Sequence, residues 1–123
     1  MLTLGQVHGG LTQGIGQALH EHTVYEDSSG QLVSASFMDY GLPRADDLPD
    51  FEIGFNEVPT KANPLGVKGS GQAGCIAAPQ TVMNAVLDAL APLGITRLDM
   101  PATPQRIWEA IRGSGSGKLS GKS

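Results

Sequence analysis

The sequence predicts an α+β fold, a few β-strands with about three helices packed on them, and two kinds of periodicity lead to this prediction. Apolar residues recur at helical spacing over residues 6–22 and 76–91. Residues 51–58 instead alternate between apolar and polar side chains, as a strand with one buried face does. Two or three strands are too few to close a barrel, so we expect an incomplete sheet that needs a partner.

The first predicted helix, residues 6–22, contains more glycine than a helix normally tolerates. Each glycine in a helix interior costs up to about 1 kcal/mol relative to alanine. The expected apolar face consists of Val7, Leu11, Ile15, Ala18 and Leu19. An adjacent face carries Gln6, Gln13 and Gln17, a polar but uncharged stripe. Spacing alone leaves two explanations for the glycines open: close packing against a neighbour, or contact with a ligand.

The rest of the chain is expected to form a hairpin, loops, two further helices and a tail. Strand-like runs on either side of Asp27-Ser-Ser-Gly30 predict a hairpin over residues 23–36. Thr103-Pro104 is a suitable cap and first position for a last helix that ends at Ile111. We therefore assign residues 1–112 to one domain. Residues 113–123, which are rich in Gly, Ser and Lys, are expected to form a flexible tail.

Composition excludes several classes of protein. The chain has 123 residues, a net charge of −4 and no basic run in its main part, which argues against nucleic-acid binding. No stretch approaches the roughly 20 apolar residues that a membrane-spanning helix needs, and the first residues lack a signal-peptide pattern. A single cysteine rules out an internal disulfide framework and fits a reducing compartment. A soluble cytoplasmic protein is expected.

The most unusual stretch runs from Asn63 to Gly74 and is dense in glycine. Gly69-Ser-Gly71-Gln-Ala-Gly74 matches the G-x-G-x-x-G pattern of dinucleotide-binding proteins. However, a proline-containing loop precedes it instead of a buried strand, and no acidic residue follows at the expected offset of about 20. Glycine amides before a helix can also seat an anion, which Lys68 would favour. A seat for a ligand and a purely structural turn both remain open.

Neither the histidines nor the cysteine predict a catalytic or metal site. His20 and His22 are two positions apart and cannot share a helix face, and no cysteine or carboxylate is usefully spaced with all three histidines, His8 included. We therefore expect no metal ligated by protein side chains. Cys75, at the expected start of the second helix, is interpreted as a small buried side chain because no His or Asn pattern around it indicates a nucleophile.

Four motifs, in this order, resemble one known family. They are Gly5-Gln-Val-His-Gly-Gly-Leu-Thr-Gln-Gly-Ile-Gly16, Asp39-Tyr-Gly-Leu-Pro43, Pro64-Leu-Gly-Val-Lys-Gly-Ser-Gly-Gln-Ala-Gly74 and Thr103-Pro-Gln-Arg-Ile-Trp108. Together they are similar to the C-terminal end of the molybdenum-cofactor subunit of the xanthine dehydrogenase, aldehyde oxidase and aerobic carbon monoxide dehydrogenase family. The resemblance covers roughly residues 3–111. It implies that the chain is part of the second molybdopterin-binding domain of such a large subunit.

The resemblance also implies a cofactor and partners. The cofactor is molybdopterin, often in its cytosine dinucleotide form. Gln6 matches a glutamine that contacts this cofactor in relatives, and the turn made by Lys68, Gly69, Ser70 and Gly71 matches the backbone beside the molybdenum centre. The implied partners are the remainder of the large subunit and the iron–sulfur and FAD-binding subunits or domains that carry electrons away.

One position departs from the family's pattern. In active relatives the residue after this turn is a glutamate, the general base that removes the proton from the hydroxyl that attacks the substrate. This chain has Gln72 there, and a neutral amide cannot accept a proton near neutral pH. An inactive variant, a paralogue with other chemistry, or a base supplied from elsewhere would each account for the difference.

We therefore interpret the chain as a fragment of a molybdenum-dependent oxidoreductase that helps to form the molybdopterin site and the active-site wall. The expected reaction is hydroxylation of an aldehyde, a heteroaromatic compound or a similar small substrate. The isolated chain is expected to be inactive, to bind neither molybdopterin nor molybdenum, and to self-associate through apolar faces. The alternative is a non-catalytic structural or interaction module derived from the same family.

Overall fold

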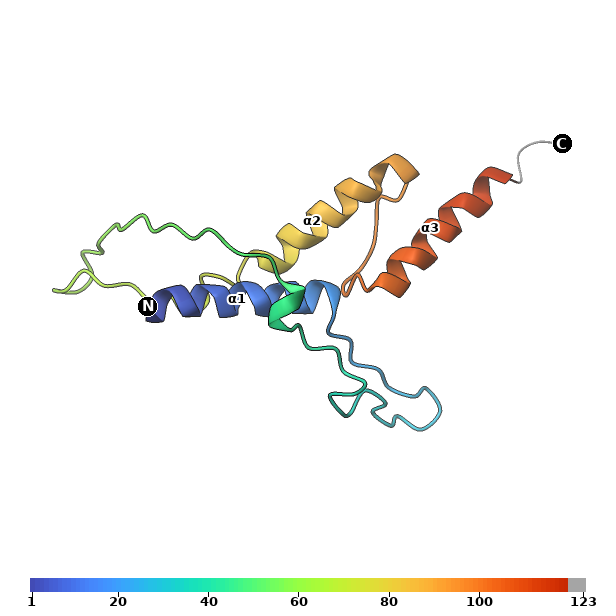
Figure 1. Cartoon of the computed structure of the whole chain (residues 1–123), viewed down its shortest axis with the longest axis horizontal. Helices are drawn as coiled ribbons and strands as arrows, with labels where there is room; N and C mark the ends of the chain where they lie inside the picture. Colours follow the sequence, from blue (N-terminus) through green and yellow to red (C-terminus); the bar gives the residue numbers. More distant parts are fainter. Residues whose placement is uncertain (120–123) are drawn as a thin grey trace.

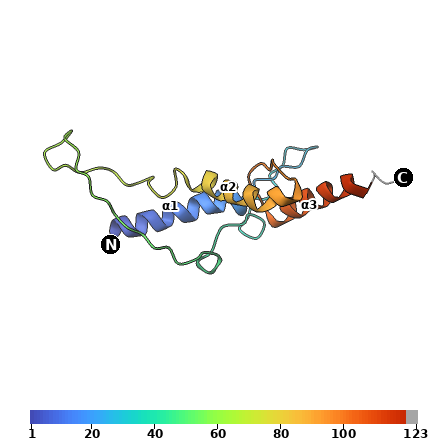
Figure 2. The ribbon, with the colours of Figure 1, turned by 90° about the horizontal axis from the view of Figure 1, so that it is seen from above.

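The structure, a computed structural model, describes residues 1–119. It contains three α-helices, and α3 lies beyond the C-terminal end of α1 in both views (Figures 1 and 2). The helices are α1 (Leu2–Leu19), α2 (Ala78–Leu90) and α3 (Pro104–Leu119), with short 3-10 helices η1 (Ala45–Asp47) and η2 (Ala91–Leu93). The three predicted helices are confirmed, although α1 begins four residues earlier than predicted. No helix among the described residues is long and apolar enough to cross a membrane.

Close contacts of α1 with the start of α2, with the turn before it and with the loop at Pro43 explain three of the glycines. A Cβ on Gly14 would lie 2.5 Å from the Cβ of Ala78 and 2.9 Å from Cδ of Pro79. A Cβ on Gly10 would lie 2.9 Å from the backbone nitrogen of Cys75. At Gly16 the space is taken by Pro43, 2.9 Å away. Close packing is therefore the right explanation at these positions, because a Cβ would collide with backbone at Gly10 and with side chains at Gly14 and Gly16.

The buried core is small and lies where α1, α2 and the segment before α3 meet. Ala18, Met83 and Ala102 form its centre, and Ala102 donates its backbone N–H to the carbonyl of Ala18 at 2.6 Å. Half-buried residues packed around this centre are Leu19, Val82, Val86, Leu98 and Ile107. Many large apolar side chains remain outside it; Leu65, for example, is 83% exposed. The exposed apolar surface is the feature from which self-association was predicted, and self-association itself stays a prediction.

The predicted hairpin is present as a turn with a single β-bridge. Tyr25 and Leu32 form the bridge, and Gly30 adopts a left-handed φ of 69° in the turn between them. The backbone N–H of Val33 donates to the carbonyl of Val24 at 2.8 Å. The pairing stops there, so the two predicted strands do not extend along the described chain.

The loop after this turn returns to the C-terminal end of α1. The hydroxyl of Tyr40 donates to a carboxylate oxygen of Glu21 at 2.7 Å. Next to it, Gly41 lies against the backbone of His20, where an added Cβ would be 3.2 Å from the carbonyl oxygen. Together with Pro43 over Gly16, these contacts hold the loop to the helix.

Residues 51–58 are extended, but they form no strand in the described structure. Phe51 and Ile53 are half-buried while Glu52 and Gly54 are exposed, so the predicted alternation is visible at the start of the segment. A strand also requires a pairing neighbour, and alternation of side chains does not reveal one. Among the described residues the only β-pairing is the bridge in the turn, so the α+β class stays a prediction.

The last helix extends beyond its predicted end. It begins at Pro104 as expected and continues to Leu119, past Ile111. Trp108 is 54% exposed and lies under the guanidinium of Arg112, 4.7 Å from the ring centroid. The domain boundary at residue 112 and the flexible tail stay predictions, and residues 120–123 of that tail lie outside the described residues.

Two substitutions on α1 separate the packing contact from helix propensity. Gly14→Ala should lower the free energy of unfolding by about 1–2 kcal/mol, because the new methyl group overlaps Ala78. Gly9→Ala is the matched control: no atom lies within 4 Å of its added Cβ, so it should raise the free energy of unfolding by up to ~1 kcal/mol. Urea unfolding followed by helical circular dichroism measures both. Equal effects of the two substitutions would contradict the packing described here.

The contact between Tyr40 and Glu21 predicts a shifted titration. The hydrogen bond to Glu21, together with desolvation and the charge of Glu21, raises the pKa of Tyr40 above its ordinary value of 10.0. The stability that this contact contributes is present at neutral pH and is lost as pH rises through the raised pKa. In a Tyr25→Phe background, Tyr40 is the remaining tyrosine. Ultraviolet titration should then show that Glu21→Gln lowers the pKa of Tyr40, and identical curves would contradict the contact.

Candidate functional site

The glycine-rich stretch is a series of turns that is fixed on α1. The backbone N–H of Ala73 donates to the carbonyl of Ser70 at 3.2 Å, and that of Ile76 donates to the carbonyl of Gln72 at 3.0 Å. Gly74 then crosses the backbone of α1, where an added Cβ would collide with the carbonyl of Val7 and lie 3.0 Å from the nitrogen of Leu11. This crossing fixes the position of Gln72, two residues earlier, relative to α1.

Two other glycines of the stretch, Gly69 and Gly71, have no such close contact among the described residues. No atom lies within 4 Å of a Cβ added to Gly69 or to Gly71. Gly66 adopts a left-handed φ of 67°, which favours glycine in the preceding turn. The sequence left two explanations open, a structural turn and a seat for a ligand. The structural explanation holds at Gly74, whereas open space adjoins Gly69 and Gly71. These two glycines lie several residues before α2 begins at Ala78, so they are not part of a helix N-terminus. Whether they seat a ligand stays open.

A side-chain hydrogen bond joins two of the predicted site residues. The amide Nε2 of Gln6 donates to the carbonyl oxygen of Gly71 at 2.7 Å, across 65 positions of sequence. No hydrogen bond to Oε1 of Gln6 is found among the described residues, so this oxygen is available as an acceptor. The bond holds the turn against the N-terminal half of α1 at the point that precedes Gln72.

Gln72 opens onto a pocket of about 300 Å³ whose rim is rich in neutral amides. Its lining consists of Gln13, Gln17, Gly71, Gln72, Cys75, Ile76, Pro79 and Gln80. Gln13 and Gln17 come from the polar stripe of α1, one helical turn apart. The sequence indicated that stripe, but we assigned only Gln6 to the site. Gln80 had no sequence signal, because only the packing of α2 on α1 brings it to the pocket.

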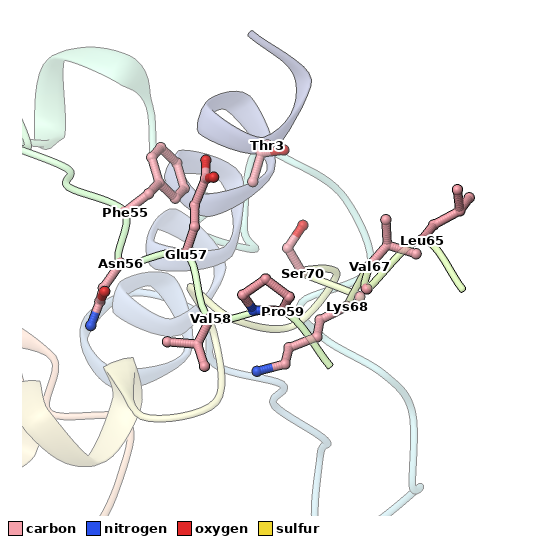
Figure 3. A pocket seen from close by; sticks show the side chains of 12 residues that line it. Thr3, Phe55, Asn56, Glu57, Val58, Pro59, Leu65, Val67, Lys68 and Ser70 are labelled. Carbon is pink, nitrogen blue, oxygen red and sulfur yellow. The ribbon is translucent and has the colours of Figure 1, made fainter. Parts of the chain in front are cut away.

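Lys68 and Ser70 face a second, larger pocket of about 610 Å³ (Figure 3). It lies between residues 55–59, the returning residues 65–70 and Thr3 of α1. Its charged side chains are Glu57 and Lys68. Five of the six predicted site residues therefore line the two pockets: Lys68, Gly69 and Ser70 this one, and Gly71 and Gln72 the other. Gln6 lines neither pocket and is joined to them through its bond to Gly71.

The histidines serve local structure or lie apart from the two pockets. The ring of His8 contacts the carbonyl of Leu4 through Nδ1 at 2.9 Å and packs against Phe51 at a centroid distance of 6.0 Å. No group of three or more His, Cys, Asp or Glu side chains in the described part of the chain could hold a metal ion. Cys75 is a free, half-buried thiol beside Gln72, three residues before α2 begins. The sequence had predicted a small buried side chain at the helix start.

Comparison with known proteins gives a consistent result. The family of the molybdopterin cofactor-binding domain matches residues 1–49. The nicotine 6-hydroxylase large subunit of Paenarthrobacter nicotinovorans is 46% identical over 109 residues, which are 89% of this chain and 13% of that protein. The carbon monoxide dehydrogenase large chain of Hydrogenophaga pseudoflava is 37% identical over 91% of this chain and 14% of that protein.

A solved structure agrees in backbone as well as in sequence. Quinoline 2-oxidoreductase from Pseudomonas putida 86 superposes with a TM-score of 0.83 at 44% identity, covering 89% of this chain and 14% of that one. The chain thus belongs to the family of molybdenum-binding large subunits that includes the xanthine dehydrogenases, aldehyde oxidoreductases and carbon monoxide dehydrogenases. It spans about a seventh of the length of the relatives that it matches.

The hydrogen bond of Gln6 can be tested with an isosteric change. Gln6→Glu replaces the amide donor by a carboxylate oxygen, which repels the carbonyl of Gly71. Loss of a bond worth about 1 kcal/mol should speed hydrogen exchange at the amide of Ala73 about fivefold. Gln13→Glu is the matched control, with the same change of charge on the same helix and no bond to the turn. If both variants exchange alike, the bond does not hold the turn.

Proposed function

We propose that this chain forms one wall of the molybdopterin site and of the active site in a molybdenum hydroxylase. The observation that carries the proposal is the hydrogen bond from Gln6 to Gly71, which brings two predicted site residues from distant parts of the sequence together beside Gln72. Membership of the family supplies the cofactor, and the relatives' length makes the activity a property of a larger assembly.

The residues present fit a molybdopterin. Such a cofactor offers many hydrogen-bond donors and acceptors on its pterin, and neutral amides can satisfy both kinds. Gln6, with Oε1 available, and the exposed backbone at Gly69 and Gly71 are the groups that would hold it. The glycines leave space that a Cβ would partly fill. Lys68 would pair with an anionic group such as a phosphate.

When bound, the cofactor supplies a redox centre that accepts two electrons from the substrate. The residues of this chain position the substrate and enclose one side of it. Gln72 can donate through its amide nitrogen and accept through its oxygen, so it can orient a hydroxyl or a substrate nitrogen in the pocket of about 300 Å³. It cannot remove a proton near neutral pH, so a proton acceptor would have to come from elsewhere.

For the substrate, we propose a small heteroaromatic compound. Two relatives carry names that state such substrates, nicotine 6-hydroxylase at 46% identity and quinoline 2-oxidoreductase at 44%. The neutral amide rim of the pocket at Gln72 suits an uncharged ring nitrogen, which can accept a hydrogen bond from an amide. By the same family relation, we propose a cytoplasmic complex with iron–sulfur and FAD-binding partners and with molybdopterin in its cytosine dinucleotide form.

A second candidate is a structural module that has lost catalysis. The neutral side chain of Gln72 favours this candidate, because a pocket that lacks a general base can still bind a ligand without converting it. The two candidates differ in a simple measurement: a catalytic subunit turns over substrate, whereas a module binds its partner polypeptide without turnover.

The decisive substitution is Gln72→Glu in the large subunit that contains this segment. If the chain contributes the position of the general base, the carboxylate should raise kcat/KM by about 10²–10⁴-fold, the usual range for general-base catalysis. The gain should appear as pH rises through the pKa of the new carboxyl group. Gln80→Glu adds the same charge to the same pocket and should give no comparable gain.

The 123-residue chain itself provides the second arm of this experiment. Because it supplies one wall of the site, we expect no molybdenum in the purified chain and no turnover with a heteroaromatic substrate and a dye acceptor. Stoichiometric molybdenum in this chain would contradict the proposed division of the site. Equal gains from Gln72→Glu and Gln80→Glu would contradict the assigned role of position 72.

A further inference from the structure

The backbone of residues 51–59 makes no hydrogen bond in the part of the chain that the structure describes. The segment runs extended from η1 towards the turn at residues 60–66, which lies beyond the N-terminus of α1 in both views (Figures 1 and 2). That turn is closed: the N–H of Thr60 donates to the carbonyl of Gly66 at 3.0 Å, and both Leu65 and Val67 donate backbone N–H groups to Oδ1 of Asn63. The unpaired backbone of residues 51–59 thus leads directly into an ordered turn.

The side chains of this arm already alternate as in a β-strand. At the start, Phe51 and Ile53 are half-buried, and the ring of Phe51 packs on His8 of α1. Further along, Phe55 and Glu57 point to one side of the backbone and Asn56 and Val58 to the other (Figure 3). In a strand the hydrogen-bonding groups lie in the plane between the two side-chain faces. Contact with α1 through one face therefore leaves both hydrogen-bonding edges open.

The returning arm does not satisfy these groups. The bond between Thr60 and Gly66 is the backbone hydrogen bond that joins the two arms, and beyond it they diverge. The space between them is the pocket of about 610 Å³, with Phe55, Val58, Leu65 and Val67 on its walls. Phe55 is 56% exposed and Val58 60% exposed, so apolar surface borders the open edge. An extended apolar arm with free edges is the form that accepts an added strand.

We propose that residues 51–58 are a strand of a β-sheet completed by a strand from the rest of the large subunit, outside these 123 residues. Relatives are about seven times as long, and the matching solved structure contains this fold within such a chain, so ample polypeptide is available to pair with it. A sheet shared in this way accounts for the alternation in the sequence and for the missing pairing in the described residues. The inference rests on the proposed function in one respect, that the segment works within a large subunit.

Hydrogen exchange on the large subunit that contains this segment tests the pairing directly. In a strand, N–H groups of successive residues point to opposite edges, so pairing along one edge protects every second amide. We expect exchange at alternate amides of residues 52–58 to be at least about 100-fold slower than in an unstructured peptide of the same sequence. Exchange at unprotected rates throughout 52–58 would overturn the proposal.

Proline substitutions identify the paired edge. Asn56 and Glu57 are both exposed, and their N–H groups point to opposite edges. Asn56→Pro removes one N–H and Glu57→Pro removes the other, whereas Asn56→Ala and Glu57→Ala retain them and serve as matched controls. One proline variant should abolish protection of the neighbouring amides while its alanine control keeps it. If both proline variants keep full protection, the amides are shielded by burial and no strand is paired.

Two further outcomes identify a different partner and overturn the proposal. Protection that appears only after the iron–sulfur and flavin subunits are added would place the pairing strand in another subunit. Protection in the 123-residue chain that rises with its concentration would indicate pairing between two copies. Molybdenum content of the same large-subunit preparation reports separately on the proposed function: unprotected amides with full molybdenum refute the strand alone, and protected amides without molybdenum refute the function alone.

Discussion

The structure depends on the close approach of two segments to α1, where the backbone of Gly74 crosses at Gly10 and the side chains of Ala78 and Pro79 pack on Gly14. With so small a core, side-chain burial alone cannot fix the angle and position of α2 on α1. Backbone contact can, because atoms that already touch leave no room to slide. The cost of placing glycine within a helix is offset by the approach that it permits. Ala18 lies one turn beyond Gly14 on the same face of α1 and is buried in the core.

The geometry of the candidate site depends on this crossing. Gln72 lies two residues before Gly74, and Gln80 lies in the first turn of α2, so both are positioned relative to Gln13 and Gln17 by the same contact. The bond from Gln6 then fixes the turn at its other end. A site built from three separate segments is thus held by glycine contacts that touch none of its functional groups. Substitutions at Gly10 or Gly14 would therefore disturb the pocket without altering any residue that lines it.

Sequence alone predicted the helices well and the pairing poorly. Helical periodicity is a property of one continuous segment. The helices α1, α2 and the start of α3 could therefore be recognised from residues such as Leu11, Val82 and Ile107. Strand pairing requires a second segment, and alternation from Phe51 to Val58 cannot say where that segment is. The same distinction applies to the site. Gln72 and Gly71 were recognisable from a motif, whereas Gln80 and Cys75 join the pocket only through tertiary packing.

The chemistry of the pocket at Gln72 follows from what lines it. Its described lining contains four glutamines and no carboxylate or imidazole, so this wall can donate and accept hydrogen bonds but has neither of the common general bases. A wall of this kind can select an uncharged ligand and fix its orientation, which contributes to rate through positioning. Proton transfer needs a group whose pKa lies nearer to neutral pH. The relatives are about seven times as long as this chain, so further polypeptide is available in them to carry such a group. The neutral wall and the unpaired backbone of residues 51–58 are therefore consistent with one another: each is completed, under the two proposals above, by groups from outside this chain.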